Sequence, residues 1–219
     1  MYVGLKMLKS FQTVTPKTPV LQAQKLLDQA DLWMLLVTDG DRLVGYLRSE
    51  DISAALPSVM TTLDKHEALY LVSKLTVDKI MRRDITTVPP ELEIEAAADI
   101  MCKKNLAGLA VTDARGALVG YISRTVMLEV FVEEMGFRDG GSRLVVEVED
   151  RRGVLHELSG IVLEHGVSII STGTFYHDGQ RMVVLRLACD DASPIAAAIQ
   201  QRGYRLMCAA DFVAEWIRQ

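Results

Sequence analysis

Residues 37–47 read VTDGDRLVGYL, and residues 111–122 read VTDARGALVGYI. The second stretch repeats the first at an offset of 74 residues, from Val37 to Val111. The offset becomes 75 after a turn that is longer by one residue, from Leu43 to Leu118. Repetition at a fixed period is the sequence signature of a duplicated structural unit. We therefore expect two copies of one supersecondary module.

The match extends from this hairpin back to the start of each copy. The sequence TVTP at 13–16 returns as TVPP at 87–90. Apolar residues then recur at three-to-four spacing, which is typical of an amphipathic helix. Each copy is predicted to run strand, helix, strand, turn, strand, helix. A β-α-β-β-α unit of this kind leaves one apolar sheet face uncovered, so we expect the copies to stack face to face, with clefts at their junction.

The predicted boundaries follow the repeat. The first copy is expected over residues 1–60 and the second over residues 77–138, with residues 61–76 between them. Apolar positions throughout the stretch 56–76 favour an ordered helical link over a flexible tether.

The last third of the chain has a different pattern, and Gly140-Gly141 marks its start. Turn residues and periodicity predict six elements: strands at 144–148, 167–176, 181–188 and 204–209, and helices at 155–165 and 193–202. Their order, βαββαβ, is a ferredoxin-like arrangement over residues 142–211. A short tail follows at 212–219. The expected fold class is α+β in both parts of the chain.

The repeat resembles the CBS domain, whose tandem pair forms a Bateman module. Three marks carry the resemblance: a T-V-x-P first strand, an apolar strand that ends in V-x-D, and a glycine-led tail, G-h-h-[ST]-x-x-D, that opens the last helix. The resemblance covers about residues 1–136.

In the CBS family this tail binds nucleotides, with the Ser or Thr hydroxyl near the phosphate and the carboxylate on the ribose hydroxyls. The first tail, GYLRSED at 45–51, keeps the carboxylate as Asp51 but has Arg48 in place of the hydroxyl. A guanidinium is always charged and could hold phosphate with its planar fork. The second tail, GYISRTV at 120–126, keeps the hydroxyl as Ser123 but has Val126 in place of the carboxylate.

The resemblance also implies an adenine slot lined by a first strand, from the same repeat or the opposite one. It nominates Thr87, Val88 and Pro89 for one pocket, and Thr13, Val14 and Pro16 for the other. These residues can equally be core, just as Ser123 can be an N-cap and Asp51 a charge at the start of a helix.

Residues 142–211 resemble the ACT domain through D-R-x-G-V-L at 150–155 and G-V-S-I-I at 166–170. In ACT domains that bind amino acids, these stretches contact the effector at a dimer interface. The resemblance nominates Asp150, Gly153, Val154, Leu155, Val167, Ser168 and Ile169. Arg152 stands where proline is usual and Ser168 where asparagine is usual. Dimerisation through sheet edges without an effector is therefore an equally open interpretation.

A tandem CBS pair followed by one ACT domain is the layout of the bacterial acetoin-utilisation regulatory protein family. The M-K-x-D stretch of that family is matched here by MRRD at 81–84. This resemblance implies a regulatory role and leaves the regulated partner unknown.

Composition argues against several classes of function. The formal net charge is −5, whereas nucleic-acid binding needs a basic stripe, so we expect no nucleic-acid partner. The first nine residues lack a signal-peptide core and no run of about 18 apolar residues occurs, so we expect no membrane association and a cytoplasmic location. Cys102, Cys189 and Cys208 form no redox or metal pair and are expected to be buried thiols.

The sequence contains none of the usual catalytic motifs. The histidines are isolated, and HExxH, GxSxG and Walker sequences do not occur, so we expect neither an enzyme, a metal site nor a cofactor. The favoured hypothesis is an allosteric regulatory protein that senses an adenine nucleotide (AMP, ATP or S-adenosylmethionine) through the CBS pair. We expect a homodimer or higher homo-oligomer, with an amino acid as a further ligand of the ACT domain. The alternative is a structural adaptor with empty CBS clefts that acts through protein–protein contacts alone.

Overall fold

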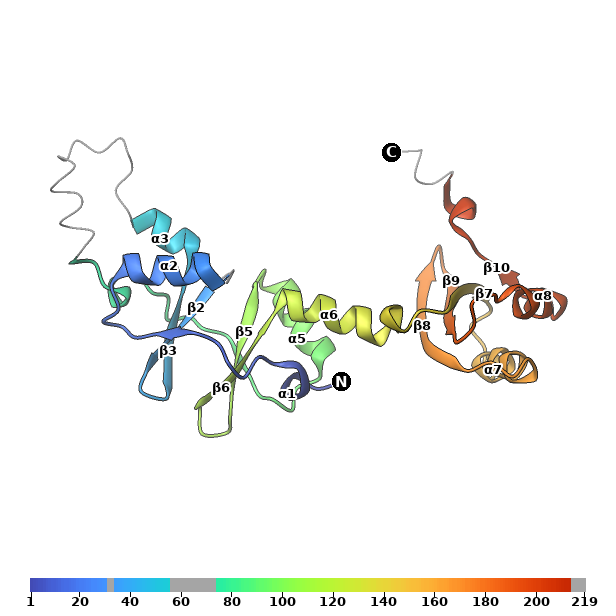
Figure 1. Cartoon of the computed structure of the whole chain (residues 1–219), viewed down its shortest axis with the longest axis horizontal. Helices are drawn as coiled ribbons and strands as arrows, with labels where there is room; N and C mark the ends of the chain where they lie inside the picture. The colour runs from blue at the N-terminus through green and yellow to red at the C-terminus, as the bar shows by residue number, and fades with distance from the viewer. Residues whose placement is uncertain (31–33, 56–73, 214–219) are drawn as a thin grey trace. The chain divides into compact units, whose positions relative to one another are not determined.

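The computed structural model describes residues 1–30, 34–55 and 74–213 (Figure 1). The chain divides into two compact units, Met1–Leu128 and Glu129–Gln219. Most of the link between the copies, at residues 56–73, lies outside the described residues, as does most of the predicted C-terminal tail.

The first copy folds as the repeat predicts. β1 (Thr13–Val14), β2 (Met34–Asp39) and β3 (Arg42–Arg48) form one sheet, with β1 parallel and β3 antiparallel to β2. α2 (Val20–Ala30) precedes β2, and α3 (Ser49–Ala55) follows β3. Gly40 begins the hairpin turn at a φ of +58°, a conformation that glycine adopts without steric cost.

The second copy reproduces the first, element by element. β4 (Thr87–Val88), β5 (Gly108–Thr112) and β6 (Leu118–Ser123) form a sheet of the same order and directions, with α5 (Ile94–Lys103) before β5 and α6 (Arg124–Glu134) after β6. Even an irregularity recurs, because the hairpin register shifts after Val37 in one copy and after Val111 in the other. The predicted duplication is confirmed.

The two sheets of the first unit pack on each other through one apolar cluster. Equivalent residues of the copies meet there, Leu36 with Ala110 and Tyr46 with Tyr121, and all are buried. Gly108 makes room for Tyr121, because a Cβ on Gly108 would lie 2.2 Å from the tyrosine oxygen. Mutual burial covers the apolar face that each sheet would otherwise expose to water. The predicted face-to-face stacking is confirmed.

The segment before the first strand of each copy packs on the opposite copy, which the sequence did not predict. In α1 (Val3–Lys6), the Val3 N–H donates to the Leu92 carbonyl of the second copy at 2.9 Å. In η1 (Val77–Lys79), the Val77 N–H donates to the Thr18 carbonyl of the first copy, also at 2.9 Å. Val3 and Val77 are fully buried. Packing therefore crosses between the copies at both segments.

These exchanged segments also add a backbone bridge to each sheet. Arg82 exchanges two hydrogen bonds with Tyr46, at 2.8 and 2.9 Å, and Leu8 exchanges two with Tyr121, at 2.8 and 3.0 Å. Gly45 permits the first bridge, because a Cβ there would lie 2.5 Å from the Arg82 carbonyl oxygen.

The second unit is a four-stranded antiparallel sheet with two helices against one face (Figure 1). β7 (Ser142–Val148), β8 (Ile169–His177), β9 (Gln180–Leu187) and β10 (Arg205–Leu206) lie in the order β10-β7-β9-β8. α7 (Val154–Glu164) and α8 (Ser193–Gln201) pack on Val146, Val183 and Leu185 of the sheet. Short helical turns precede and follow these elements, η2 (Phe137–Asp139) and η3 (Ala209–Phe212). The predicted βαββαβ order is confirmed.

Two details of the prediction are wrong. The last strand ends at Leu206, because the Asp211 carboxylate accepts the Cys208 N–H at 2.6 Å and starts η3 where the strand was expected to continue. The thiols of Cys102 and Cys208 are exposed. Cys102 lies on α5 directly after buried Met101, so the helical rotation turns it out of the core.

Replacing Gly45 with Ala should destabilise the first unit by about 1–3 kcal/mol, the usual cost of overpacking. The backbone of Arg82 would have to move away from Tyr46, since the new Cβ meets a carbonyl oxygen. Urea denaturation of both proteins measures the change. Gly160→Ala in α7, where a Cβ meets nothing within 4 Å, is the control and should leave stability unchanged or raise it by about 1 kcal/mol. Equal stability of Gly45→Ala and the wild type would contradict the proposed close approach.

Candidate functional site

The junction of β3 and α3 brings Arg48 and Asp51 together. Arg48 ends β3, and Asp51 lies in the first turn of α3 with its carboxylate turned back towards the strand. Arg48 donates its backbone N–H and Nε to Asp51 Oδ2, at 3.1 and 3.2 Å, and Nη2 to Oδ1 at 3.4 Å. The Asp51 side chain is only 10% exposed. The residues nominated for phosphate and ribose thus form an ion pair with each other.

Arg82 completes this group, and the sequence analysis did not predict it there. Its backbone is held by the bridge to Tyr46, and its Nε donates to Asp51 Oδ1 at 2.8 Å. The sequence signal was the MRRD stretch at 81–84, which says nothing of a partner 31 residues earlier. Arg48, Asp51 and Arg82 together form the Asp51 cluster.

The Asp51 carboxylate has its hydrogen-bonding capacity filled. Two oxygens offer about four lone-pair positions, and the two arginines supply four N–H donors. Burial by itself raises the pKa of Asp51, but the hydrogen bonds from Arg48 and Arg82 outweigh burial and hold the pKa below its usual value. The bonds to Asp51 also raise the pKa of both guanidinium groups. All three groups are therefore charged at neutral pH.

The second copy has a different hydrogen bond at the start of the equivalent helix, α6. Ser123 is the N-cap residue of α6, and its Oγ accepts the backbone N–H of Val126 at 3.3 Å. In the first copy the reverse bond forms, from the N–H of Arg48 at the N-cap to the carboxylate of Asp51. A capping box joins both bonds at one helix, and here each copy makes one of them. Val126 is buried, and its side chain gives a ribose no acceptor.

The residues nominated for the adenine slots lie on or beside the two short first strands, Thr13, Val14 and Pro16 at β1 and Thr87, Val88 and Pro89 at β4. Val14 and Val88 are buried, at 4% and 3% exposure, whereas both threonines are exposed. Thr87 follows Arg82 by five positions in the chain, so β4 begins within about 18 Å of Arg82 in the Asp51 cluster.

The second unit exposes some of the residues nominated for an effector and buries others. The exposed ones are Asp150, Gly153, Leu155 and Ser168, while Val154, Val167 and Ile169 belong to the core or pack against it. The Asp150 carboxylate accepts Tyr176 Oη and Arg181 Nη1, both at 2.8 Å. Gly153 is the N-cap residue of α7 at a φ of +87°, which favours glycine.

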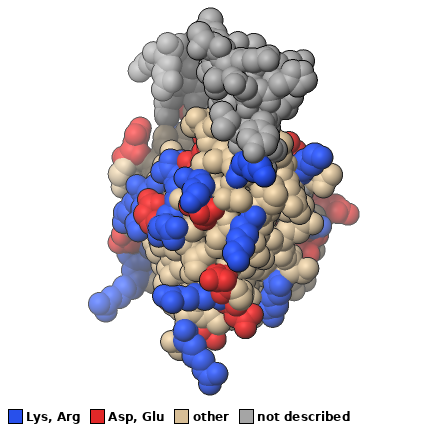
Figure 2. Space-filling model, turned by 90° about the vertical axis from the view of Figure 1, so that its left-hand side faces the viewer, with Lys and Arg blue, Asp and Glu red and all other residues tan. Residues whose placement is uncertain are grey.

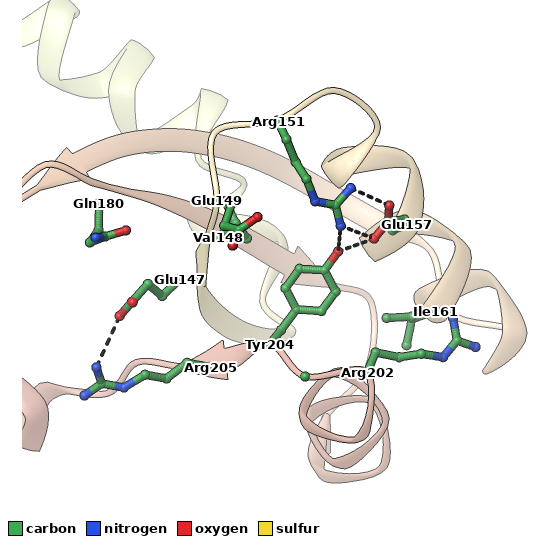
Figure 3. Close-up of a pocket in the computed structure, with 11 residues that line it drawn as sticks. Glu147, Val148, Glu149, Arg151, Glu157, Ile161, Gln180, Arg202, Tyr204 and Arg205 are labelled. Carbon is green, nitrogen blue, oxygen red and sulfur yellow. Dashed lines mark hydrogen bonds and ion pairs between the residues drawn. The ribbon is translucent and has the colours of Figure 1, made fainter.

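A pocket of about 520 Å³ lies at the end of β7, between α7 and the connection from α8 to β10 (Figure 3). Arg151 donates to both carboxylate oxygens of Glu157 at 2.7 Å, and the Tyr204 hydroxyl donates to the same carboxylate. The bond from Arg151 lowers the pKa of Glu157 to about 2. On the opposite wall, Arg205 pairs with Glu147 at 3.3 Å. Each of these four charged side chains pairs with another inside the pocket. The sequence analysis did not predict this pocket.

The CBS domain family matches residues 3–58 and 77–133, slightly more than half of the chain. The chain belongs to the CBS domain family. An uncharacterised protein of Methanocaldococcus jannaschii is 29% identical to this chain over 128 residues, 58% of this chain and 38% of that protein. The chain thus spans well under half the length of this relative.

Solved structures share the fold of the CBS pair. A Vibrio cholerae protein described as an acetoin utilization protein (AcuB) superimposes with a TM-score of 0.54 at 20% identity, over 65% of this chain and 98% of its own. CBSX2 of Arabidopsis thaliana, solved in complex with AMP, superimposes with a TM-score of 0.50 at 28% identity, over 60% of this chain and 96% of its own.

The surface of the CBS-pair protein carries mixed charge. Figure 2 shows basic and acidic side chains interspersed on the face in view. Within residues 1–30, 34–55 and 74–213, no group of three or more His, Cys, Asp and Glu side chains is placed to hold a metal ion. No helix in the same ranges is long and apolar enough to cross a membrane.

The Asp51 cluster should stabilise the CBS pair in a pH-dependent manner. Because the folded-state pKa of Asp51 is lowered, its contribution is present above the unfolded-state pKa of about 4 and is lost as pH falls through the lower folded-state value. Asp51→Asn should therefore be less stable than the wild type at pH 7, and the gap should narrow below about pH 4. Urea denaturation across this range measures the gap. Glu50→Gln, at a carboxylate 73% exposed, is the control; a constant gap for Asp51→Asn would refute the assignment.

Proposed function

We propose that this chain is a non-catalytic, cytoplasmic regulatory protein that senses an adenine nucleotide through its CBS pair. The second unit serves as an ACT domain that mediates dimerisation or binds a small effector such as an amino acid. The nucleotide, which is AMP, ATP or S-adenosylmethionine, regulates the affinity of the chain for a separate protein. Such coupling requires that the ligand favour one of two conformations.

The Asp51 cluster is the observation that supports nucleotide binding. Asp51 matches the carboxylate that binds ribose in the family motif, and two guanidinium groups lie within hydrogen-bond distance of it. Guanidinium groups form short, strong pairs with phosphate. CBSX2, which shares the CBS-pair fold, is solved with AMP. The combination favours an adenine nucleotide with its ribose at Asp51 and its phosphates at Arg48 and Arg82.

The second candidate function is a structural adaptor, and the same cluster provides its support. Asp51 is a helix-start acceptor that is already satisfied, and Val126 replaces the carboxylate in the other copy. An adaptor would keep these residues for folding alone, and nucleotides would leave its melting temperature unchanged, because only a ligand that binds the native state raises it.

Asp51→Ala should remove recognition of the ribose hydroxyls. The wild type should bind AMP about tenfold or more tightly than 2′,3′-dideoxy-AMP, because hydrogen bonds to a charged group contribute about 1.5–3 kcal/mol. In Asp51→Ala the two ligands should bind with similar affinity. Isothermal titration of both ligands into both proteins measures this difference. A purely structural Asp51 would lower the melting temperature and leave the preference for AMP intact.

Glu50→Ala is the matched control for this titration. Glu50 is the neighbouring carboxylate and lies 3.4 Å from Arg48 Nε, but its side chain is 73% exposed to solvent. Its removal should leave the preference for AMP unchanged. Absence of any adenine-nucleotide binding to the wild type would favour the adaptor.

The chain should self-associate through the second unit. β8 is an edge strand of nine residues, and Phe175 and Tyr176 on it are 42% and 62% exposed. Unpaired edge strands are templates for pairing with another chain, and symmetric dimers are the commonest oligomers. Light scattering at micromolar concentration should show at least twice the monomer mass of 24.3 kDa. A monomer alone would refute dimerisation.

Melting temperatures of the same protein with added amino acids test whether the second unit binds an effector. A bound amino acid should raise the melting temperature, whereas indifference to all twenty would leave the ACT domain with dimerisation alone.

A further inference from the structure

The filled carboxylate of the Asp51 cluster imposes a condition on any ribose ligand. Ribose hydroxyls bind a carboxylate by donating to it, and Asp51 already accepts four N–H groups. With about four lone-pair positions available, donors have to leave before ribose hydroxyls can be accepted. The condition applies to a nucleotide bound at the first tail, and the inference drawn from it therefore rests on the proposed function.

Arg82 is the donor that can leave most easily. The backbone N–H of Arg48 is fixed at the start of α3 and cannot withdraw without disturbing the helix. The Arg48 side chain is held from two sides, by Asp51 and by Glu50. Arg82 reaches Asp51 through Nε alone, and its side chain is 43% exposed to solvent. Its departure costs one charge-assisted hydrogen bond, frees a lone-pair position for one ribose hydroxyl and leaves the helix start intact.

The displaced guanidinium stays close to the site. Two backbone hydrogen bonds to Tyr46, at 2.8 and 2.9 Å, hold Arg82 beside β3. A ribose on Asp51 carries its 5′-phosphate with it, so new anionic oxygens arrive where the guanidinium has lost its partner. We propose that Arg82 makes this site select adenine nucleotides by their phosphate charge: the ribose takes its place on Asp51, and the phosphates accept its guanidinium.

This exchange predicts different affinities for adenosine, S-adenosylmethionine, AMP and ATP. Adenosine displaces Arg82 and returns no anion to it. S-adenosylmethionine has no phosphate, and although it carries one carboxylate, its sulfonium and ammonium groups give it a net positive charge beside two arginines. AMP returns one phosphate, and ATP returns three with more charge. Affinity should therefore rise from adenosine to AMP to ATP, because guanidinium–phosphate pairs are stronger than neutral hydrogen bonds.

A comparison with the second copy indicates that Asp51 and Arg82 function as a pair. The backbone bridge between Arg82 and Tyr46 has its equivalent in the bridge between Leu8 and Tyr121. Leu8 thus corresponds to Arg82, and Val126 corresponds to Asp51 at the same place on the helix. Both members of the pair are charged in one copy, and both are apolar in the other. Replacement of Asp51 alone would leave Arg48 and Arg82 without the carboxylate that they share.

The test is isothermal titration of adenosine, AMP, ATP and S-adenosylmethionine into the wild type, Arg82→Gln, Arg82→Lys and Arg83→Gln. The wild type should prefer ATP to adenosine by at least about tenfold. In Arg82→Gln adenosine should bind as well or better, since no ion pair is broken, while ATP should weaken by at least about tenfold. Arg82→Lys keeps the charge and should keep the order of ligands. Arg83→Gln removes the same charge one residue away and should leave the preference unchanged.

The possible results separate a failure of selection by Arg82 from a failure of nucleotide binding. If Arg82→Gln binds nucleotides with the wild-type preference for ATP, Arg82 has no part in selection, although nucleotide binding stands. If adenosine and ATP weaken equally, Arg82 is structural and the inference also fails. If the wild type binds none of the four ligands, the proposed function fails and the inference fails with it.

Discussion

Mutual burial of two apolar sheet faces is the constraint on which the first unit depends. Each copy has a sheet of three strands, and its first strand has only two residues. Sheets this small need a packed face for stability. Leu36 and Tyr46 of the first sheet pack in one cluster with Ala110 and Tyr121 of the second. The exchanged segments, residues 3–8 and 77–82, strengthen this pairing. Each of them packs on one copy and then continues along the chain into the other. Neither copy is complete without residues that precede its partner.

Sequence reasoning succeeded where the signal was local or periodic. The helical spacing and the βαββαβ order depend on residues close in the chain, and the repeat at an offset of 74 residues is a periodic signal. The structure confirms all three. The exchanged segments and the position of Arg82 depend on backbone bridges between distant residues, Arg82 with Tyr46 and Leu8 with Tyr121. Such bridges join backbone groups and restrict side chains only at close approaches such as Gly45, so a single sequence does not show which residues they join. The pocket around Tyr204 is likewise formed by segments that only the tertiary fold brings together.

Asp51 shows how a folding role and a binding role compete for the same atoms. At the third position of α3 a carboxylate is favourable because it accepts the free N–H at the helix start. The same oxygens are the ones that a ribose would need. The sequence alone could identify Asp51 as a carboxylate at a helix start. It could not show that the lone pairs of this carboxylate are filled, because the fourth N–H donor comes from Arg82. In the second copy only the folding role is met, by Ser123, and a buried valine takes the place of the acid.

Under the proposed function, the place of Arg82 in the chain would link this competition to regulation. Arg82 pairs with Tyr46 in the first sheet, and five residues later Thr87 pairs with Ala110 in the second. In the proposed exchange, the Arg82 guanidinium changes its partner at one end of the short segment that joins the two sheets. Regulation by a ligand needs two arrangements with different affinities for it. The structure has Arg82 on Asp51. The proposed exchange would supply a second arrangement, with Arg82 on phosphate, and the segment from Arg82 to Thr87 would then carry the difference from one copy to the other.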